Sequence, residues 1–218
     1  PSQIPLAQRW DEAASRAKGA RLEEAMQLEP VGDLPAHDEV LAYGETEYGL
    51  EAWRGTARGA TGQSQTGVMA MRVGYVFFVD HIAYGQFTPE LREALGGNVI
   101  VVERLETSLI AQLDGRLGPR RDQRLLRRLA DGSVVVDAAD PGVATITTVV
   151  LMMHEDLTGM HVLDAGAGDG MISIVARKLG ASRVWVADHD RDILRQAERN
   201  FQLNGLVQGA DYVARRID

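Results

Sequence analysis

The 218-residue sequence has no cysteine, few aromatic residues and no excess of basic charge. The absence of cysteine excludes disulfide frameworks, thiol nucleophiles and thiolate metal sites. Aromatic residues make up 6% of the chain, and no segment interleaves them with basic residues as RNA-binding sheets do. The 23 basic residues are outnumbered by 31 acidic ones, which gives a formal net charge of -8. Nucleic acid is therefore not expected as a partner.

Long apolar runs are also missing. The densest apolar segments, 73–79 and 145–153, are far shorter than the roughly 20 residues that span a bilayer. The N-terminal segment carries charge where a signal peptide needs an apolar core. We therefore expect a cytoplasmic protein with no membrane-spanning segment. The histidines show no metal-ligand spacing, so we also predict no metal site.

The pattern of apolar residues predicts an α/β protein in three parts. Residues 1–67 are expected to be an accessory region of helix and loop, with a glycine-rich linker at 55–67. Residues 68–139 are expected to alternate strands with helices, including a helix in the arginine-rich run that ends at Leu129. The third part, 140–218, has helix around 147–157 and then a regular alternation. Its strands are predicted at 161–165, 183–187 and 212–215, and its helices at 170–179 and 190–204.

A glycine-rich turn follows the strand predicted at 161–165. Gly166, Gly168 and Gly170 stand between this strand and the next helix, and Asp164 precedes the first of them. Glycine permits positive φ and lets a ligand approach the backbone, while the N–H groups at a helix start favour an anionic group. The turn therefore predicts a cofactor-binding loop.

The spacing of this loop and a second acidic residue indicate which cofactor it binds. A dinucleotide fingerprint needs G-x-G-x-x-G/A, whereas the spacing here is G-x-G-x-G. Asp188 ends the next strand, where a carboxylate can accept both hydroxyls of a ribose, and Asp164 could receive an ammonium group. A molecule with an amino acid at one end and a nucleoside at the other would span these groups. S-adenosyl-L-methionine fits that description.

The same residues resemble the class I S-adenosylmethionine-dependent methyltransferases, in particular the ribosomal-protein methyltransferase (PrmA-like) branch. LDAGAGDG resembles the first motif of the family, KLGASRVWVADHD the second, and RQAERNFQLNGL the helix that follows. Upstream, DPGVATITTVVLMM resembles the segment in which the threonines of the family lie near the methionine moiety. The resemblance covers roughly residues 140–207, and it implies a Rossmann-like methyltransferase sheet flanked by helices.

The resemblance also implies roles for individual residues. The methionine end of the cofactor would be held by the loop, Asp188 would hold the ribose, His189 would flank the adenine, and Thr147 or Thr148 would approach the carboxylate. The implied cofactor-binding residues are Asp164, Ala165, Gly166, Gly168, Gly170, Asp188, His189, Thr147 and Thr148. No catalytic residue is identified.

The chain departs from the family in two ways. The glycine-rich insert between D-P-G and T-T is missing, and too few residues follow Gly170 to complete the sheet in the usual order. The missing half could be truncated, supplied by a partner chain or a homo-oligomer, or permuted. In the permuted arrangement, residues 73–105 would be the fourth strand, helix and fifth strand, with Asp80, His81 and Tyr84 facing substrate.

The resulting hypothesis is a methyltransferase that acts on a protein side chain or a small molecule. A non-catalytic cofactor-binding subunit that needs a partner chain is the alternative from another class. A third hypothesis, an NAD(P)-dependent oxidoreductase, is disfavoured by the spacing of the glycines.

Overall fold

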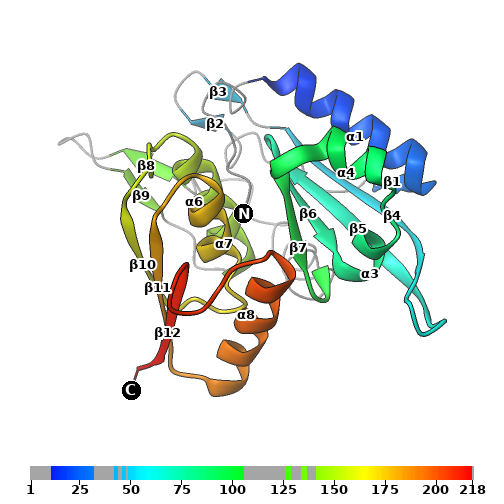
Figure 1. Cartoon of the computed structure of the whole chain (residues 1–218). Helices are drawn as coiled ribbons and strands as arrows, with labels where there is room; N and C mark the ends of the chain where they lie inside the picture. The colour runs from blue at the N-terminus through cyan, green and yellow to red at the C-terminus, as the bar shows by residue number, and fades with distance from the viewer. Residues whose placement is uncertain are drawn as a thin grey trace.

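A computed structural model of the chain describes residues 11–31, 42–43, 46–47, 49–105, 126–128, 134–136 and 141–217. Two larger sheets, of five and three strands, organise most of these residues (Figure 1). Both belong to an α/β architecture, as the sequence predicted, but they differ in strand direction and in what covers them.

The first sheet has five strands in the order β1-β4-β5-β6-β7. All neighbours in it are antiparallel except β6 and β7, which run parallel. Its strands are β1 (Glu29–Pro30), β4 (Leu50–Arg58), β5 (Ser64–Val73), β6 (Val76–Asp80) and β7 (Val99–Val102). The strands β5, β6 and β7 are rich in β-branched and large apolar residues, and β6 and β7 are buried along their whole length.

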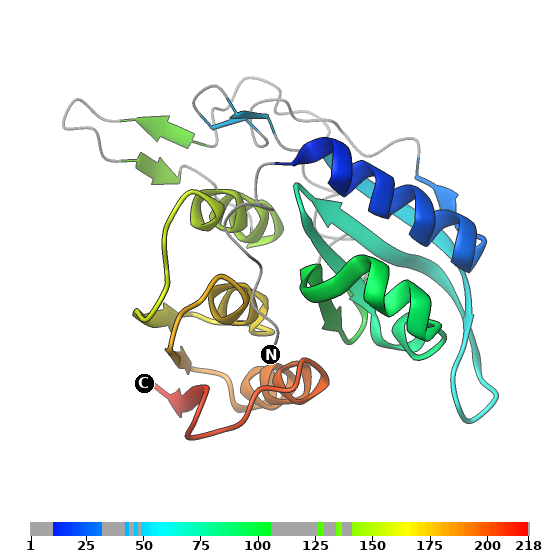
Figure 2. The same cartoon turned by 45° about the horizontal axis from the view of Figure 1, so that its top comes forward.

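Helices α1 (Glu12–Met26) and α4 (Pro89–Leu95) lie over one face of this sheet (Figure 2). The short helix α3 (His81–Gly85) and the 3-10 turn η2 (Gly96–Asn98) complete the connection from β6 to β7. Leu22 of α1 and Leu91 of α4 are buried against Trp53 and Phe77 of the sheet. The indole of Trp53 also donates a hydrogen bond to Glu23 on α1, at 2.9 Å.

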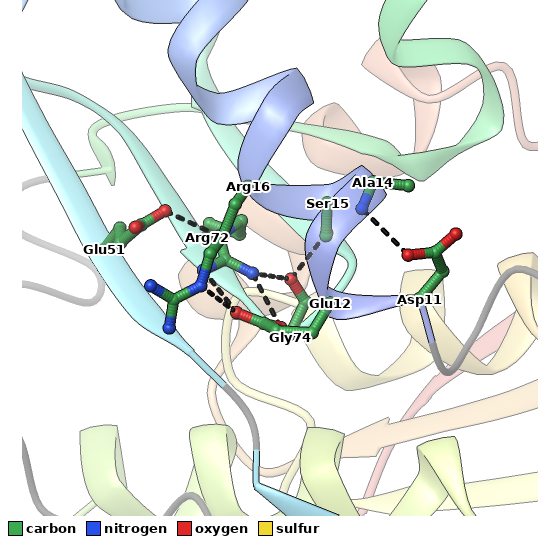
Figure 3. Close-up of polar contacts among 8 residues, drawn as sticks. All are labelled: Asp11, Glu12, Ala14, Ser15, Arg16, Glu51, Arg72 and Gly74. Carbon is green, nitrogen blue, oxygen red and sulfur yellow. Dashed lines mark hydrogen bonds and ion pairs between the residues drawn. The ribbon is translucent and has the colours of Figure 1, made fainter.

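A buried arginine fixes α1 to the sheet (Figure 3). Arg72 on β5 is fully buried, and its guanidinium donates to both carboxylate oxygens of Glu12 at 3.0 and 2.8 Å. It also donates to Glu51 at 2.8 Å and to the carbonyl oxygen of Gly74. Ser15 of α1 donates to the same carbonyl at 2.8 Å. Burying the cation is tolerable because each of the three guanidinium nitrogens donates to an acceptor.

The second sheet is the predicted parallel one, with three strands in the order β10-β11-β12. Its strands are β10 (His161–Ala165), β11 (Arg183–Asp188) and β12 (Tyr212–Arg216). Helix α7 (Met171–Lys178) connects β10 to β11, and α8 (Arg191–Leu203) connects β11 to β12. Asp190 caps α8 by accepting from Asp192 and Ile193, as the sequence indicated.

Helices α6 (Pro141–Met153), α7 and α8 lie between the two sheets and share one apolar core with both (Figure 1). The core joins Met71 and Ile100 of the first sheet to Ile174 of α7 and Phe201 of α8. The other face of the parallel sheet exposes Leu163 and Trp185, which are 68% and 39% exposed. Parallel sheets are normally covered on both faces, so three strands with one open face fit the predicted incomplete sheet.

The structure corrects three predictions about the first 139 residues. The segment 55–67 is not a linker, because β4 and β5 pair across it as a hairpin from Leu50↔Val73 to Arg58↔Ser64. The boundary expected at residue 67 therefore falls inside β5. The run before Leu129 contains a strand, β8 (Leu126–Arg128), paired antiparallel with β9 (Val134–Val136), where a helix was predicted. The β-branched valines of β9 favour this pairing. A further short pair joins β2 (Ala42–Tyr43) to β3 (Thr46–Glu47).

The permuted arrangement is also corrected. Strand β6 lies between β5 and β7 and pairs with both, and within the described residues no ladder joins β6 or β7 to the parallel sheet. The reason is local, because the tight turn at Gly74, whose φ is 57°, pairs β5 with β6 as a hairpin. Asp80, expected to face a substrate in that arrangement, is fully buried and caps α3 by accepting from the N–H of Ile82.

Candidate functional site

The glycine-rich loop lies at the carboxyl end of the parallel strands, between β10 and α7. Gly166, Gly168 and Gly170 have φ values of 75°, 55° and 80°. The backbone N–H groups of Gly166 and Ala167 both donate to the carbonyl of Ala187 on β11, at 2.8 and 3.1 Å. These bonds tie the start of the loop to the neighbouring strand. In open α/β sheets this edge is where ligands bind.

The three glycines are required for different reasons. A Cβ added to Gly166 or Gly168 would meet no atom within 4 Å, so at these positions the backbone borders open space. A Cβ on Gly170 would lie 2.6 Å from the ring of Phe201 on α8. Gly166 and Gly168 thus supply positive φ beside an open approach, while Gly170 also permits close packing of the loop on α8.

Asp188, at the end of β11, faces this loop. One carboxylate oxygen accepts from the N–H of Gly168 at 3.1 Å, and the other accepts from the N–H of Asp190 at 3.0 Å. Burial tends to raise the pKa of Asp188, but the bonds from Asp190 and Gly168 outweigh it and lower the pKa below its usual value. The side chain therefore stays ionised, and a carboxylate, with about four lone-pair sites, can accept further hydrogen bonds from ligand hydroxyls.

Asp164 occupies the end of β10 and has a different environment. Its carboxylate accepts a 2.6 Å hydrogen bond from the hydroxyl of Ser173 on α7. Burial raises the pKa of Asp164; the bond from Ser173 opposes the rise, and the charge of Asp188 adds to it. Two carboxylates thus share one end of the sheet and repel each other. A cationic ligand placed between them would relieve that repulsion.

The other predicted cofactor-binding residues have fewer described contacts. Ala165 is the exposed last residue of β10, and the His189 ring is largely exposed, with Nδ1 3.1 Å from Asp188. Thr148 is half-buried on α6, which packs on α7, whereas the side chain of Thr147 lies outside the described residues. The approach of either threonine to a ligand carboxylate stays a prediction.

Sequence reasoning missed two residues that support the loop. Ser173 holds Asp164, and Asn200 on α8 donates to the carbonyl of Asp169 at 2.9 Å. Ser173 could have been predicted, because it is a polar residue in the first turn of α7, and that turn faces back toward the end of β10. No comparable sequence signal pointed to Asn200, since an asparagine in an amphipathic helix is usually solvent-exposed.

Within the residues that the structure describes, no group of three or more His, Asp or Glu side chains could hold a metal ion. The described helices also include none that is long and apolar enough to cross a membrane.

The segment that contains the glycine-rich loop is similar to known proteins. Residues 140–216 match the sequence model of the ribosomal protein L11 methyltransferase (PrmA) family. The chain is 42% identical over 84 residues to a ribosomal protein L11 methyltransferase of Caldanaerobacter subterraneus subsp. tengcongensis, covering 35% of this chain and 27% of that protein. It is 36% identical over 88 residues to the protein of the same name from Desulfosudis oleivorans, covering 37% and 29%.

A solved ribosomal protein L11 methylase from Lactobacillus delbrueckii subsp. bulgaricus aligns with 65% of this chain and 53% of its own, at 18% identity and a TM-score of 0.39. The chain thus spans less than a third of the length of the two curated relatives above. The resemblance inferred from the glycine motif is confirmed for the segment that carries it. Over residues 140–216 the chain is similar in sequence to the ribosomal protein L11 methyltransferase (PrmA) family.

Proposed function

We propose that residues 140–216 are the S-adenosylmethionine-binding half of a class I methyltransferase, and that the methyl acceptor is a protein side chain. The observation that carries this proposal is the loop itself. Gly166 and Gly168 adopt positive φ with open space where a side chain would stand, at the carboxyl end of parallel strands. An ionised Asp188 lies directly beside them.

The charges around the loop suit this cofactor better than a dinucleotide. S-adenosylmethionine carries a cationic sulfonium and an ammonium group, and Asp164 and Asp188 provide two carboxylates that repel each other when no cation is present. A dinucleotide would instead bring an anionic pyrophosphate toward these carboxylates. When bound, the cofactor supplies an electrophilic methyl group.

The residues of this chain would have separate tasks in holding the cofactor. Asp188 would accept from the ribose hydroxyls, and its position is fixed by the N–H groups of Gly168 and Asp190. Asp164, oriented by Ser173, would face the ammonium group. Methyl transfer is an in-line displacement, so the main contribution of such a site is alignment of donor and acceptor.

The proposal of a protein acceptor follows the names of the relatives, which are methyltransferases of ribosomal protein L11. An amine acceptor must lose a proton before it attacks the methyl group. The chain has no excess of basic residues that would suit an RNA acceptor.

Calorimetry with S-adenosylhomocysteine and S-adenosylmethionine tests the proposal. Asp188→Ala should weaken binding by about 1.5–3 kcal/mol, the scale of hydrogen bonds to a charged group. Asp192→Ala is the matched control, because Asp192 lies exposed in the first turn of α8, shortly after Asp188, and forms a local ion pair with Arg195. Equal dissociation constants for wild type and Asp188→Ala would contradict the assignment. Donor binding without methyl transfer to a protein acceptor would favour the non-catalytic subunit.

A further inference from the structure

Asn200 occupies an unusual position between the glycine loop and the five-stranded sheet. Its side chain is fully buried on α8. The amide nitrogen donates to the carbonyl of Asp169 in the loop at 2.9 Å, and the amide oxygen accepts from the N–H of Glu103, just after β7, at 2.9 Å. Both partners are backbone groups, one an acceptor and one a donor, so only one orientation of the amide satisfies both.

Asn204, the residue that caps the C-terminal end of α8, makes comparable bonds to β7, and its amide nitrogen also donates to the carbonyl of Asn200 at 2.8 Å. Its amide oxygen accepts from the N–H of Val101 at 2.9 Å, and its amide nitrogen donates to the carbonyl of Val101 at 2.7 Å. It thus pairs with both backbone groups of Val101, as a neighbouring strand would. Its described side-chain bonds do not extend to the loop, which makes Asn204 an internal control for Asn200.

The hydrogen bond from Asn200 restrains the loop backbone at Asp169, between two glycines. Glycine has more conformational freedom than any other residue, so a loop with glycines at 168 and 170 needs external restraint to keep one shape. Asn200 fixes the carbonyl of the Asp169–Gly170 peptide, and the N–H of the same peptide donates to Ala167 at 2.9 Å. With both ends held, this peptide can rotate little.

We propose that Asn200 is a positioning residue: anchored on one side by the N–H of Glu103, it holds the glycine loop in the shape that binds the methyl donor. Its effect on affinity rests on the proposed function. Its effect on loop order does not, because both contacts of the amide are made with backbone groups of this chain.

Three variants separate this role from ordinary packing. Asn200→Asp keeps an oxygen for Glu103 but removes the donor to Asp169, Asn200→Ala removes both bonds, and Asn204→Ala removes only bonds outside the loop. Amide hydrogen exchange at Gly168, Gly170 and Met171 is followed by NMR in the ligand-free protein. Affinity for S-adenosylhomocysteine is then measured by calorimetry.

We expect both Asn200 variants to speed exchange at the loop amides about fivefold or more and to weaken the affinity about 5–10-fold, the effect of one lost hydrogen bond. Asn204→Ala should leave both quantities within about twofold, even though it removes two bonds to β7. If loop exchange is unchanged in both Asn200 variants, or rises equally in Asn204→Ala, the positioning role is refuted. If wild type does not bind S-adenosylhomocysteine, the proposed function fails, and the exchange data still decide the role of Asn200.

Discussion

Replacing Gly170 by alanine tests the close packing of the loop on α8. Gly170 has a φ of 80°, which costs an alanine about 1–2 kcal/mol. The new methyl group would also lie 2.6 Å from the Phe201 ring, which is fully buried and packs on Tyr212 at a centroid distance of 4.3 Å. Overpacking of this kind costs about 1–3 kcal/mol. The expected loss for Gly170→Ala is therefore about 2–5 kcal/mol.

Gly168→Ala is the matched comparison. Gly168 has a φ of 55°, but an added Cβ would meet nothing within 4 Å. Only the backbone strain of about 1–2 kcal/mol should remain. Urea denaturation followed by tryptophan fluorescence measures both variants, since Trp185 on β11 reports on the parallel sheet. In a chain of this size the difference between the variants corresponds to roughly 2–12 °C in Tm.

Two results would refute this reasoning. One is equal stability of the two variants, which would show that the methyl group at 170 meets no steric resistance. The other is simple additivity when Gly170→Ala is combined with Phe201→Leu. The smaller side chain should relieve the clash, so the double variant should lose less stability than the sum of the single changes.

Three further predictions follow from the charged groups. Burial tends to raise the pKa of Glu12, but its bonds from Arg72 lower it below the ordinary value of 4.5, so the ion pair stabilises the fold above that pH and the benefit is lost as pH falls through the lowered pKa. Glu12→Gln should therefore cost about 1–2 kcal/mol at neutral pH, a range kept low because Glu12 is a third exposed. Urea titrations at pH 7 and at acidic pH should show that the cost becomes smaller as the pH falls. Asp164→Asn should raise Tm at neutral pH, because burial raises the pKa of Asp164 and its ionised form is disfavoured in the folded chain; a lower Tm would contradict this. The same variant should bind S-adenosylmethionine more weakly, as calorimetry would show, and unchanged affinity would remove Asp164 from the site.

The parallel half of the molecule was predictable from sequence because capping residues and glycines mark where its helices begin and end. Gly180 follows α7, Asp190 caps α8, and Gly205 ends it, so the strands between them were identified correctly. The glycine spacing also located the loop, and the acids at 164 and 188 were predicted to flank it. These signals are local, and they depend on backbone conformation more than on distant partners.

The first 139 residues were predicted less well because their structure depends on pairing between distant segments. The glycine-rich stretch at 55–67 has the composition of a linker, yet the bonds between β4 and β5 hold it as a hairpin. The valine-rich strands β6 and β7 could have joined either sheet, and the turn at Gly74 decides that β6 pairs with β5. Asn200 escaped prediction for the same reason, since its partner Glu103 is remote in sequence.

The most direct test of the methyl-donor site is a titration of ¹⁵N-labelled protein with S-adenosylhomocysteine. The account predicts that the amide signals of Gly166, Gly168 and Gly170 shift together with saturation, and that Asp188→Ala weakens the response while Asp192→Ala does not. Glycine signals that stay in place at millimolar S-adenosylhomocysteine, or that respond to NAD instead, would contradict it.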